Sequence, residues 1–192
     1  MKPLIVANWK CNPITLQEAK KLFNSVKKGI KNLKNSEVVI CPPFVWLSNL
    51  DFGEEKSKLQ LGAQDCFWEE RGAFTGEISP LMLKNSGCQY VIIGHSEKRA
   101  LGETNEIINK KIKAVLKNRL KPILCVGEKE EEKEQIKETL ESQLIDGLKE
   151  ISPEQMNNLV IAYEPVWAIG TGNFCSVDDV LPVCLMLRKF FF

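Results

Sequence analysis

Two side chains suited to proton transfer follow short apolar segments of this sequence. Glu164 comes directly after Leu159–Tyr163, and His95, the only histidine, comes two residues after Tyr90–Ile93. A carboxylate at a strand end can act as a general base. His95 begins a helical segment, where the helix dipole opposes a positive charge and favours the neutral imidazole. A neutral imidazole can donate a hydrogen bond to a carbonyl oxygen and take a proton back, so the pair suits acid–base chemistry beside a carbonyl.

The segment after Glu164 has the composition of a hinged lid. It starts with the rigid Pro165-Val166-Trp167, continues through Ala168 and Ile169, and ends with Gly170-Thr171-Gly172. Proline restricts the backbone at one end, and glycine frees it at the other. A lid that closes beside a general base excludes water from the reaction.

Six short apolar runs alternate with helical patterns along the chain. The predicted strands are Leu4–Ala7, Val38–Cys41, Leu59–Gln64, Tyr90–Ile93, Pro122–Val126 and Leu159–Tyr163. Because these runs are apolar throughout, both faces of each strand are expected to be covered. Helices are predicted over Thr15–Ile30 and over Thr104–Leu120. A further helix is predicted after the fifth strand, and another begins at Pro80 with Ser79 as its cap. Strict alternation predicts a parallel α/β sheet with right-handed crossovers, in a single domain spanning residues 1–192.

Composition narrows the class of protein further. The 192 residues carry 26 basic and 25 acidic side chains, a net charge of +1, which gives no electrostatic basis for binding nucleic acid. The first apolar run is too short for a signal peptide. Seven cysteines without a C-x-x-C pair, and one histidine, make no zinc set and favour reduced thiols in the cytoplasm. We therefore expect no metal, no cofactor and no membrane association.

Two charged or apolar stretches need a separate interpretation. Glu128–Glu134 is expected to be a solvated helix start, except that Glu128 follows a strand end and could line the mouth of the sheet. Near the end of the sequence, Ser176 and Asp179 form a helix-start pattern before the apolar Val180–Leu187. That helix is too short to span a bilayer and is expected to be buried against protein, with Pro182 bending or fraying its start.

Three motifs, in this order and spacing, resemble the triosephosphate isomerase family. They are Ala7-Asn8-Trp9-Lys10, Gly94-His95-Ser96-Glu97-Lys98-Arg99, and Ala162-Tyr163-Glu164-Pro165-Val166-Trp167-Ala168-Ile169-Gly170-Thr171-Gly172. Gln64-Asp65 and Gly72–Glu77 are similar to the family's third loop, and Cys125–Glu128 to its fifth strand end. The resemblance implies a TIM barrel that interconverts dihydroxyacetone phosphate and glyceraldehyde 3-phosphate in glycolysis and gluconeogenesis.

The resemblance also assigns roles to particular residues, because the acid and base groups of the family, and the tuning of their pKa values, are known. Glu164 would take the carbon-bound proton, and neutral His95 would polarise the carbonyl. Lys10 would stabilise the enediolate and the phosphate, with Asn8 beside it. The Gly170 amide of the lid would reach the phosphate, while Glu97 would support the site without touching the substrate. Thr75 would lie on a loop that inserts into a neighbouring subunit, which implies a dimer.

The sequence departs from the family pattern in two respects. A complete barrel needs eight strands and about 250 residues, whereas this sequence supplies six βα units, so we expect an incomplete (β/α)6 barrel truncated at its C-terminal end. The family's phosphate-binding loops after strands seven and eight are missing. Asn173-Phe174-Cys175 also replaces the Lys-Thr-Ala usual at the second lid hinge, and the bulky Phe174 could impede closure.

Two functions therefore remain open at this point. The chain could be a triosephosphate isomerase of impaired activity, or a catalytically inactive incomplete barrel that persists as a self-associating structural module. Unpaired strand edges and the apolar helix predict a homo-oligomer, with a tetramer favoured over a dimer. An isomerase assay, combined with a light-scattering mass, discriminates between the two.

Overall fold

A curled sheet of six parallel strands organises the computed structural model, which describes residues 2–52 and 58–191. The strands pair in sequence order and are β1 Leu4–Asn8, β2 Glu37–Cys41, β3 Leu59–Ala63, β4 Cys88–Ile93, β5 Lys121–Val126 and β6 Val160–Tyr163. All five pairings are parallel. The predicted strands and their order are confirmed, with boundaries that differ by one or two residues.

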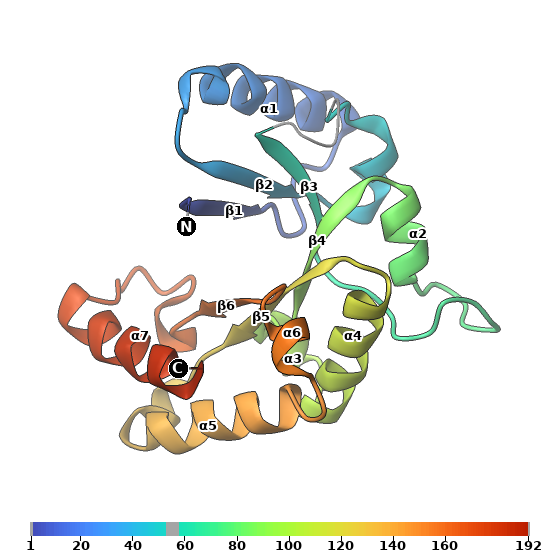
Figure 1. The fold of residues 1–192 in the computed structure, drawn as a ribbon. Coiled ribbons are helices and arrows are strands. Elements are labelled where there is room, and N and C mark those ends of the chain that lie inside the picture. Colours follow the sequence, from blue (N-terminus) through green and yellow to red (C-terminus); the bar gives the residue numbers. More distant parts are fainter. Residues whose placement is uncertain (1, 53–57, 192) are drawn as a thin grey trace.

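Helices cover the outside of this sheet (Figure 1). The α-helices are α1 Leu16–Gly29, α2 Pro80–Asn85, α3 Ser96–Ala100, α4 Asn105–Lys117, α5 Ile136–Gly147, α6 Pro153–Met156 and α7 Val177–Phe191. Short 3-10 segments are η1 Ile30–Asn32, η2 Phe44–Asn49, η3 Glu130–Gln135 and η4 Val166–Ala168. The fold is an α/β incomplete TIM barrel, in which β1 and β6 are the edges of the described sheet.

Side-chain caps fix where several helices begin. Thr15 and Glu18 form a reciprocal capping box at α1, and the Ser79 hydroxyl accepts the Met82 N–H in front of Pro80 at α2. The Thr104 hydroxyl accepts the Ile107 N–H at the start of α4. Each such cap is worth about 1 kcal/mol, so these helix starts follow directly from local sequence.

The core lies on both faces of the sheet, as the uninterrupted apolar runs predict. One cluster packs between the strands and α4, α5 and α7, and includes Ile93, Ile108 and Leu144. A second cluster fills the inner face and is made of Val39, Cys41, Tyr90, Ile92, Ile123 and Cys125. Parallel strands are stable only when both faces are covered in this way.

Helix α7 is buried against its own chain on one side and exposed on the other, so the expected burial against protein is seen for part of its surface. Val183 and Leu187 are 7% exposed and belong to the core, whereas Leu181 and Leu185 are 54% and 50% exposed. Ser176 and Asp179 exchange hydrogen bonds at its start. Pro182 lies inside the helix, which is continuous from Val177, so the expected fraying of its start is not seen. One side of α7 packs against its own chain, and the other faces away from it.

Candidate active site

Lys10 stands just beyond β1 in an unusual backbone conformation. Its φ of 53° lies in the left-handed region, which costs a non-glycine residue about 1–3 kcal/mol. Two side chains hold it there: the Asn8 Oδ1 accepts the Lys10 N–H at 2.9 Å, and the Gln64 Nε2 donates to the Lys10 carbonyl at 2.9 Å. The same Gln64 amide nitrogen bonds the Cys41 carbonyl at 2.8 Å. Strands β1, β2 and β3 thus jointly position Lys10.

His95 is oriented by the first turn of α3. Gly94, before it, has a φ of +71°, and an added Cβ there would lie 2.9 Å from Ile108. The His95 Nδ1 accepts the Glu97 backbone N–H at 3.2 Å. A nitrogen that accepts a hydrogen bond carries no proton, so this contact assigns the remaining proton of a neutral ring to Nε2. That nitrogen lies 3.2 Å from the Glu164 Oε2.

Glu164 lies directly after β6, and its side chain points toward α3. Its Oε1 accepts the Ser96 backbone N–H at 2.6 Å, and its side chain is 15% exposed. Burial raises the pKa of Glu164, although His95, the Ser96 N–H and Lys10 each oppose the rise. A carboxylate with a raised pKa is a stronger base than an ordinary one.

Glu97 joins the Lys10 ammonium to this group. Its Oε1 accepts the Lys10 Nζ at 2.8 Å, and its Oε2 lies 3.6 Å from the His95 Nδ1. The predicted residues Asn8, Lys10, His95, Glu97 and Glu164 therefore form one connected set of contacts. They come from the carboxyl ends of β1, β4 and β6, which share one edge of the parallel sheet.

Arg99 holds this edge together, although nothing in the sequence pattern predicts a role for it. Its guanidinium donates to the Gly94 carbonyl at 2.8 Å, the Asn105 Oδ1 at 2.7 Å and the Cys125 carbonyl at 3.2 Å. It thereby ties α3 to the ends of β4 and β5 and to α4. The motif around His95 contained Arg99, but only the folded chain places its partners within reach.

The lid is anchored at its first end by Glu128. This residue is 1% exposed, and its Oε1 accepts both the Tyr163 hydroxyl at 3.0 Å and the Trp167 Nε1–H at 2.7 Å. The Lys133 ammonium lies 3.7 Å from the centre of a Trp167 ring, a cation–π contact. Glu128, which the sequence suggested could line the mouth of the sheet, lies just beyond the carboxyl end of β5 as a buried acceptor for two groups of the lid region.

Two parts of the predicted site, the end of the lid and the Thr75 loop, lie away from this set. The lid residues Gly170–Gly172 are exposed, and a Cβ added at Gly170 would meet nothing within 4 Å. Thr75 is exposed on the loop between β3 and α2, which extends away from the body of the molecule (Figure 1). In the described residues, no group of three His, Cys, Asp or Glu side chains could hold a metal ion.

Comparison with known proteins identifies the family of this chain. The family model described as triosephosphate isomerase matches residues 3–191. The chain belongs to the triosephosphate isomerase family. Relatives of that name include those of Thermoanaerobacter pseudethanolicus, 47% identical over 191 residues, and of Lactobacillus delbrueckii subsp. bulgaricus, 48% identical over 190 residues. The first match covers 98% of this chain and 76% of the relative, and the second 97% and 75%.

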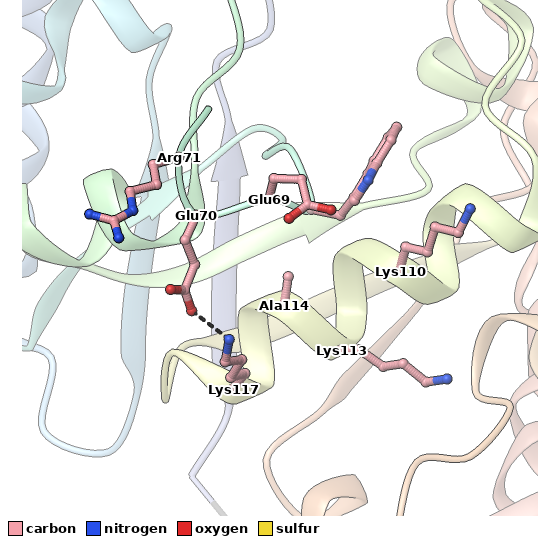
Figure 2. A pocket seen from close by; sticks show the side chains of 8 residues that line it. Glu69, Glu70, Arg71, Lys110, Lys113, Ala114 and Lys117 are labelled. Carbon is pink, nitrogen blue, oxygen red and sulfur yellow. Dashed lines mark ion pairs between the residues drawn. The ribbon is translucent and has the colours of Figure 1, made fainter. Parts of the chain in front are cut away.

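A cavity of about 660 Å³ lies elsewhere on this triosephosphate isomerase family chain, between the β3–α2 loop and α4 (Figure 2). Its lysines are paired: Lys117 with Glu70 at 2.9 Å, Lys110 with Glu106 at 2.8 Å, and Lys113 with Glu150 at 2.6 Å. Exposed pairs of this kind are worth about 0–1 kcal/mol. The cavity includes none of Lys10, His95 and Glu164, so we interpret it as a charged, solvated surface.

Proposed function

We propose that this chain interconverts dihydroxyacetone phosphate and glyceraldehyde 3-phosphate, with Glu164, His95 and Lys10 as its catalytic residues. The observation that carries the proposal is the 3.2 Å approach of the Glu164 carboxylate to the His95 Nε2, with the Lys10 ammonium held nearby at 2.8 Å from Glu97, whose backbone N–H donates to His95. A general base, a neutral imidazole and an ammonium in one place suit proton transfer beside a carbonyl.

In the proposed reaction, Glu164 removes the proton from the carbon next to the substrate carbonyl. The His95 Nε2–H donates to the carbonyl oxygen and stabilises the enediolate as it forms, while the Lys10 ammonium stabilises the same negative charge. Glu164 then returns the proton to the neighbouring carbon, while His95 gives its Nε2 proton to the former carbonyl oxygen and takes the proton of the adjacent hydroxyl, whose oxygen becomes the new carbonyl. In the substrate-free arrangement, both Glu164 oxygens have partners, since Ser96 N–H and His95 occupy them. Substrate must therefore displace at least one of these contacts.

The lid would complete this site by closing over the substrate. Residues 165–172 would exclude water from the enediolate, and the Gly170 amide would bind the phosphate. Asn8 would assist from the β1 end, where it already fixes the Lys10 backbone. Glu97 would act through its contacts with Lys10 and His95 rather than through substrate.

Turnover by the 192-residue polypeptide alone is expected to be weak. Its match covers 76% of the Thermoanaerobacter relative, and the sheet of the described residues contains six strands. The phosphate-binding loops that the family pattern places after strands seven and eight are not among the described βα units. Remote binding energy is used to stabilise the transition state, so a weaker phosphate grip lowers kcat/KM. Exposed Phe174 at the second hinge adds a bulky group to the moving segment.

We further propose a cytoplasmic homo-oligomer. Thr75 lies on the projecting loop, where the neighbouring Phe74 is 44% exposed, and this loop would supply one interface. The outward side of α7, with Leu181 and Leu185, would supply another. Two kinds of contact favour a tetramer over a dimer. None of the described helices is long and apolar enough to cross a membrane.

A coupled isomerase assay on purified protein tests the catalytic proposal. Glu164→Gln should lower kcat at least about 10³-fold, because general-base catalysis contributes up to about 10⁴-fold. Glu138→Gln, an exposed change on α5, is the matched control. Retained activity in the Glu164 variant would disprove the assignment. If the folded wild-type chain shows no turnover but a light-scattering mass above the monomer, the self-associating module is the better interpretation.

A further inference from the structure

Gly127 brings the end of β5 into direct contact with the backbone of Glu164. A Cβ built on Gly127 would lie 1.8 Å from the Glu164 carbonyl oxygen and 3.5 Å from the Glu164 Cγ. No side chain fits in this space, since a real Cβ essentially never approaches another atom more closely than 3.0 Å. The location of the Gly127 peptide therefore limits where the Glu164 peptide can lie.

Two backbone hydrogen bonds on either side of Gly127 hold the base and the start of the lid. The Glu164 N–H donates to the Val126 carbonyl at 2.9 Å, and the Val166 N–H donates to the Glu128 carbonyl at 3.1 Å. Gly127 lies between these two acceptors. A shift of its peptide would move both acceptors, and with them both Glu164 and Val166.

Both polar groups of Gly127 are bound by one side chain, that of Gln143 on α5. The Gly127 N–H donates to the Gln143 Oε1 at 3.0 Å, and the Gln143 Nε2 donates to the Gly127 carbonyl at 2.9 Å. The amide supplies one donor and one acceptor, as a neighbouring strand would. Its helix is fixed by Leu140 and Leu144, which are 0% and 1% exposed.

We propose that Gln143 is a positioning residue for Glu164 and for the first residues of the lid. It acts through the Gly127 peptide, without contact to substrate, and the inference rests on the proposed role of Glu164 as the base. A carboxylate side chain lacks the donor for the Gly127 carbonyl, and a thioether cannot donate to that carbonyl and accepts the Gly127 N–H only weakly. Only a side-chain amide of this length satisfies both groups at once.

Two substitutions test this role, each with two readouts. Gln143→Met keeps the side-chain length and loses the paired hydrogen bonds, whereas Gln143→Glu keeps the shape and sets a carboxylate oxygen against the Gly127 carbonyl. Glu138→Met, on the exposed side of the same helix, is the matched control. The first readout is steady-state kinetics, and the second is hydrogen exchange at the Glu164 and Val166 amides, which requires no turnover.

Both Gln143 variants should lower kcat about 10- to 100-fold and leave KM within about threefold, since misplacement by about 1 Å can cost about 100-fold. Exchange at the Glu164 and Val166 amides should accelerate at least about tenfold, while amides in the middle of β4 remain protected. Unchanged exchange at both amides, or uniform acceleration through the sheet, would overturn the proposal. If wild-type protein shows no turnover, the catalytic proposal fails, and the exchange readout still decides whether Gln143 holds this segment.

Discussion

Glu128→Ala is expected to destabilise the protein and to free the first end of the lid. The Glu128 carboxylate is 1% exposed, and one of its oxygens accepts two hydrogen bonds, from the Tyr163 hydroxyl and the Trp167 indole. Alanine removes that acceptor and leaves both donors unpaired. It also removes a buried charge, so the two effects oppose each other.

The size of the loss follows from these contacts. A hydrogen bond to a charged group contributes about 1.5–3 kcal/mol, so two bonds give roughly 3–6 kcal/mol before other terms. Tyr163 and Trp167 are only partly buried, so water can reach their freed donors. Relief of carboxylate burial offsets a further part. We therefore expect a net loss of about 2–4 kcal/mol, a large share of the roughly 5–15 kcal/mol typical of a domain.

Urea unfolding measures this difference, with Glu128→Gln as the matched control. Glutamine keeps an acceptor for both donors, and its stability should lie within about 1 kcal/mol of the wild type. Burial and the Glu128 charge raise the pKa of Tyr163. Glutamine should therefore lower the pKa of Tyr163 in an ultraviolet titration. An unfolding free energy of Glu128→Ala within about 0.5 kcal/mol of the wild type, or equal destabilisation by both variants, would contradict this role of the Glu128 carboxylate.

Three further predictions concern the site and the assembly. Because burial raises the pKa of Glu164, kcat/KM should fall as the pH decreases, with an apparent pKa above the ordinary glutamate value of about 4.3. An apparent pKa at or below that value would contradict this prediction. Lys10→Met should abolish turnover yet change the unfolding free energy by at most about 1 kcal/mol, since its ion pair is exposed; urea unfolding decides. Leu185→Asp, at a half-exposed site, should reduce the light-scattering mass without lowering Tm, whereas Leu187→Asp, in the core, should lower Tm; equal effects would argue against an α7 interface.

Local patterns predicted the strands well, because both faces of a parallel sheet demand apolar side chains. Their boundaries moved where polar residues take part in the ladder: β2 starts at Glu37, which pairs with Leu4, and β5 starts at Lys121, which pairs with Tyr90. The backbone groups of such residues pair whatever their side chains are. The apolar pattern does not register backbone pairing by polar residues, so it predicts strand centres better than strand ends.

The residues of the candidate site are marked in the sequence, whereas the contacts that support them are not. Lys10, His95 and Glu164 stand out because each follows an apolar run. Gln143 and Arg99 carry no comparable signal. Their side chains bind backbone groups of Gly127 and Cys125, which are distant from them in the sequence. Contacts of this kind exist only once helix and strand have packed, so no spacing along the chain marks them.

Glu164, the proposed base, follows the strand that has the fewest paired residues in the described sheet. Strand β6 pairs with β5 alone among the described residues, through Ile123–Val160 to Val126–Tyr163. In a closed barrel, each strand is held from two sides. Here the position of Glu164 depends on one neighbour, and beyond the last strand pair it depends on Val126, Gly127 and Glu128. The amide of Gln143 and the carboxylate of Glu128 therefore matter more for the geometry of proton transfer in this chain than they would in a barrel with a strand on each side of β6.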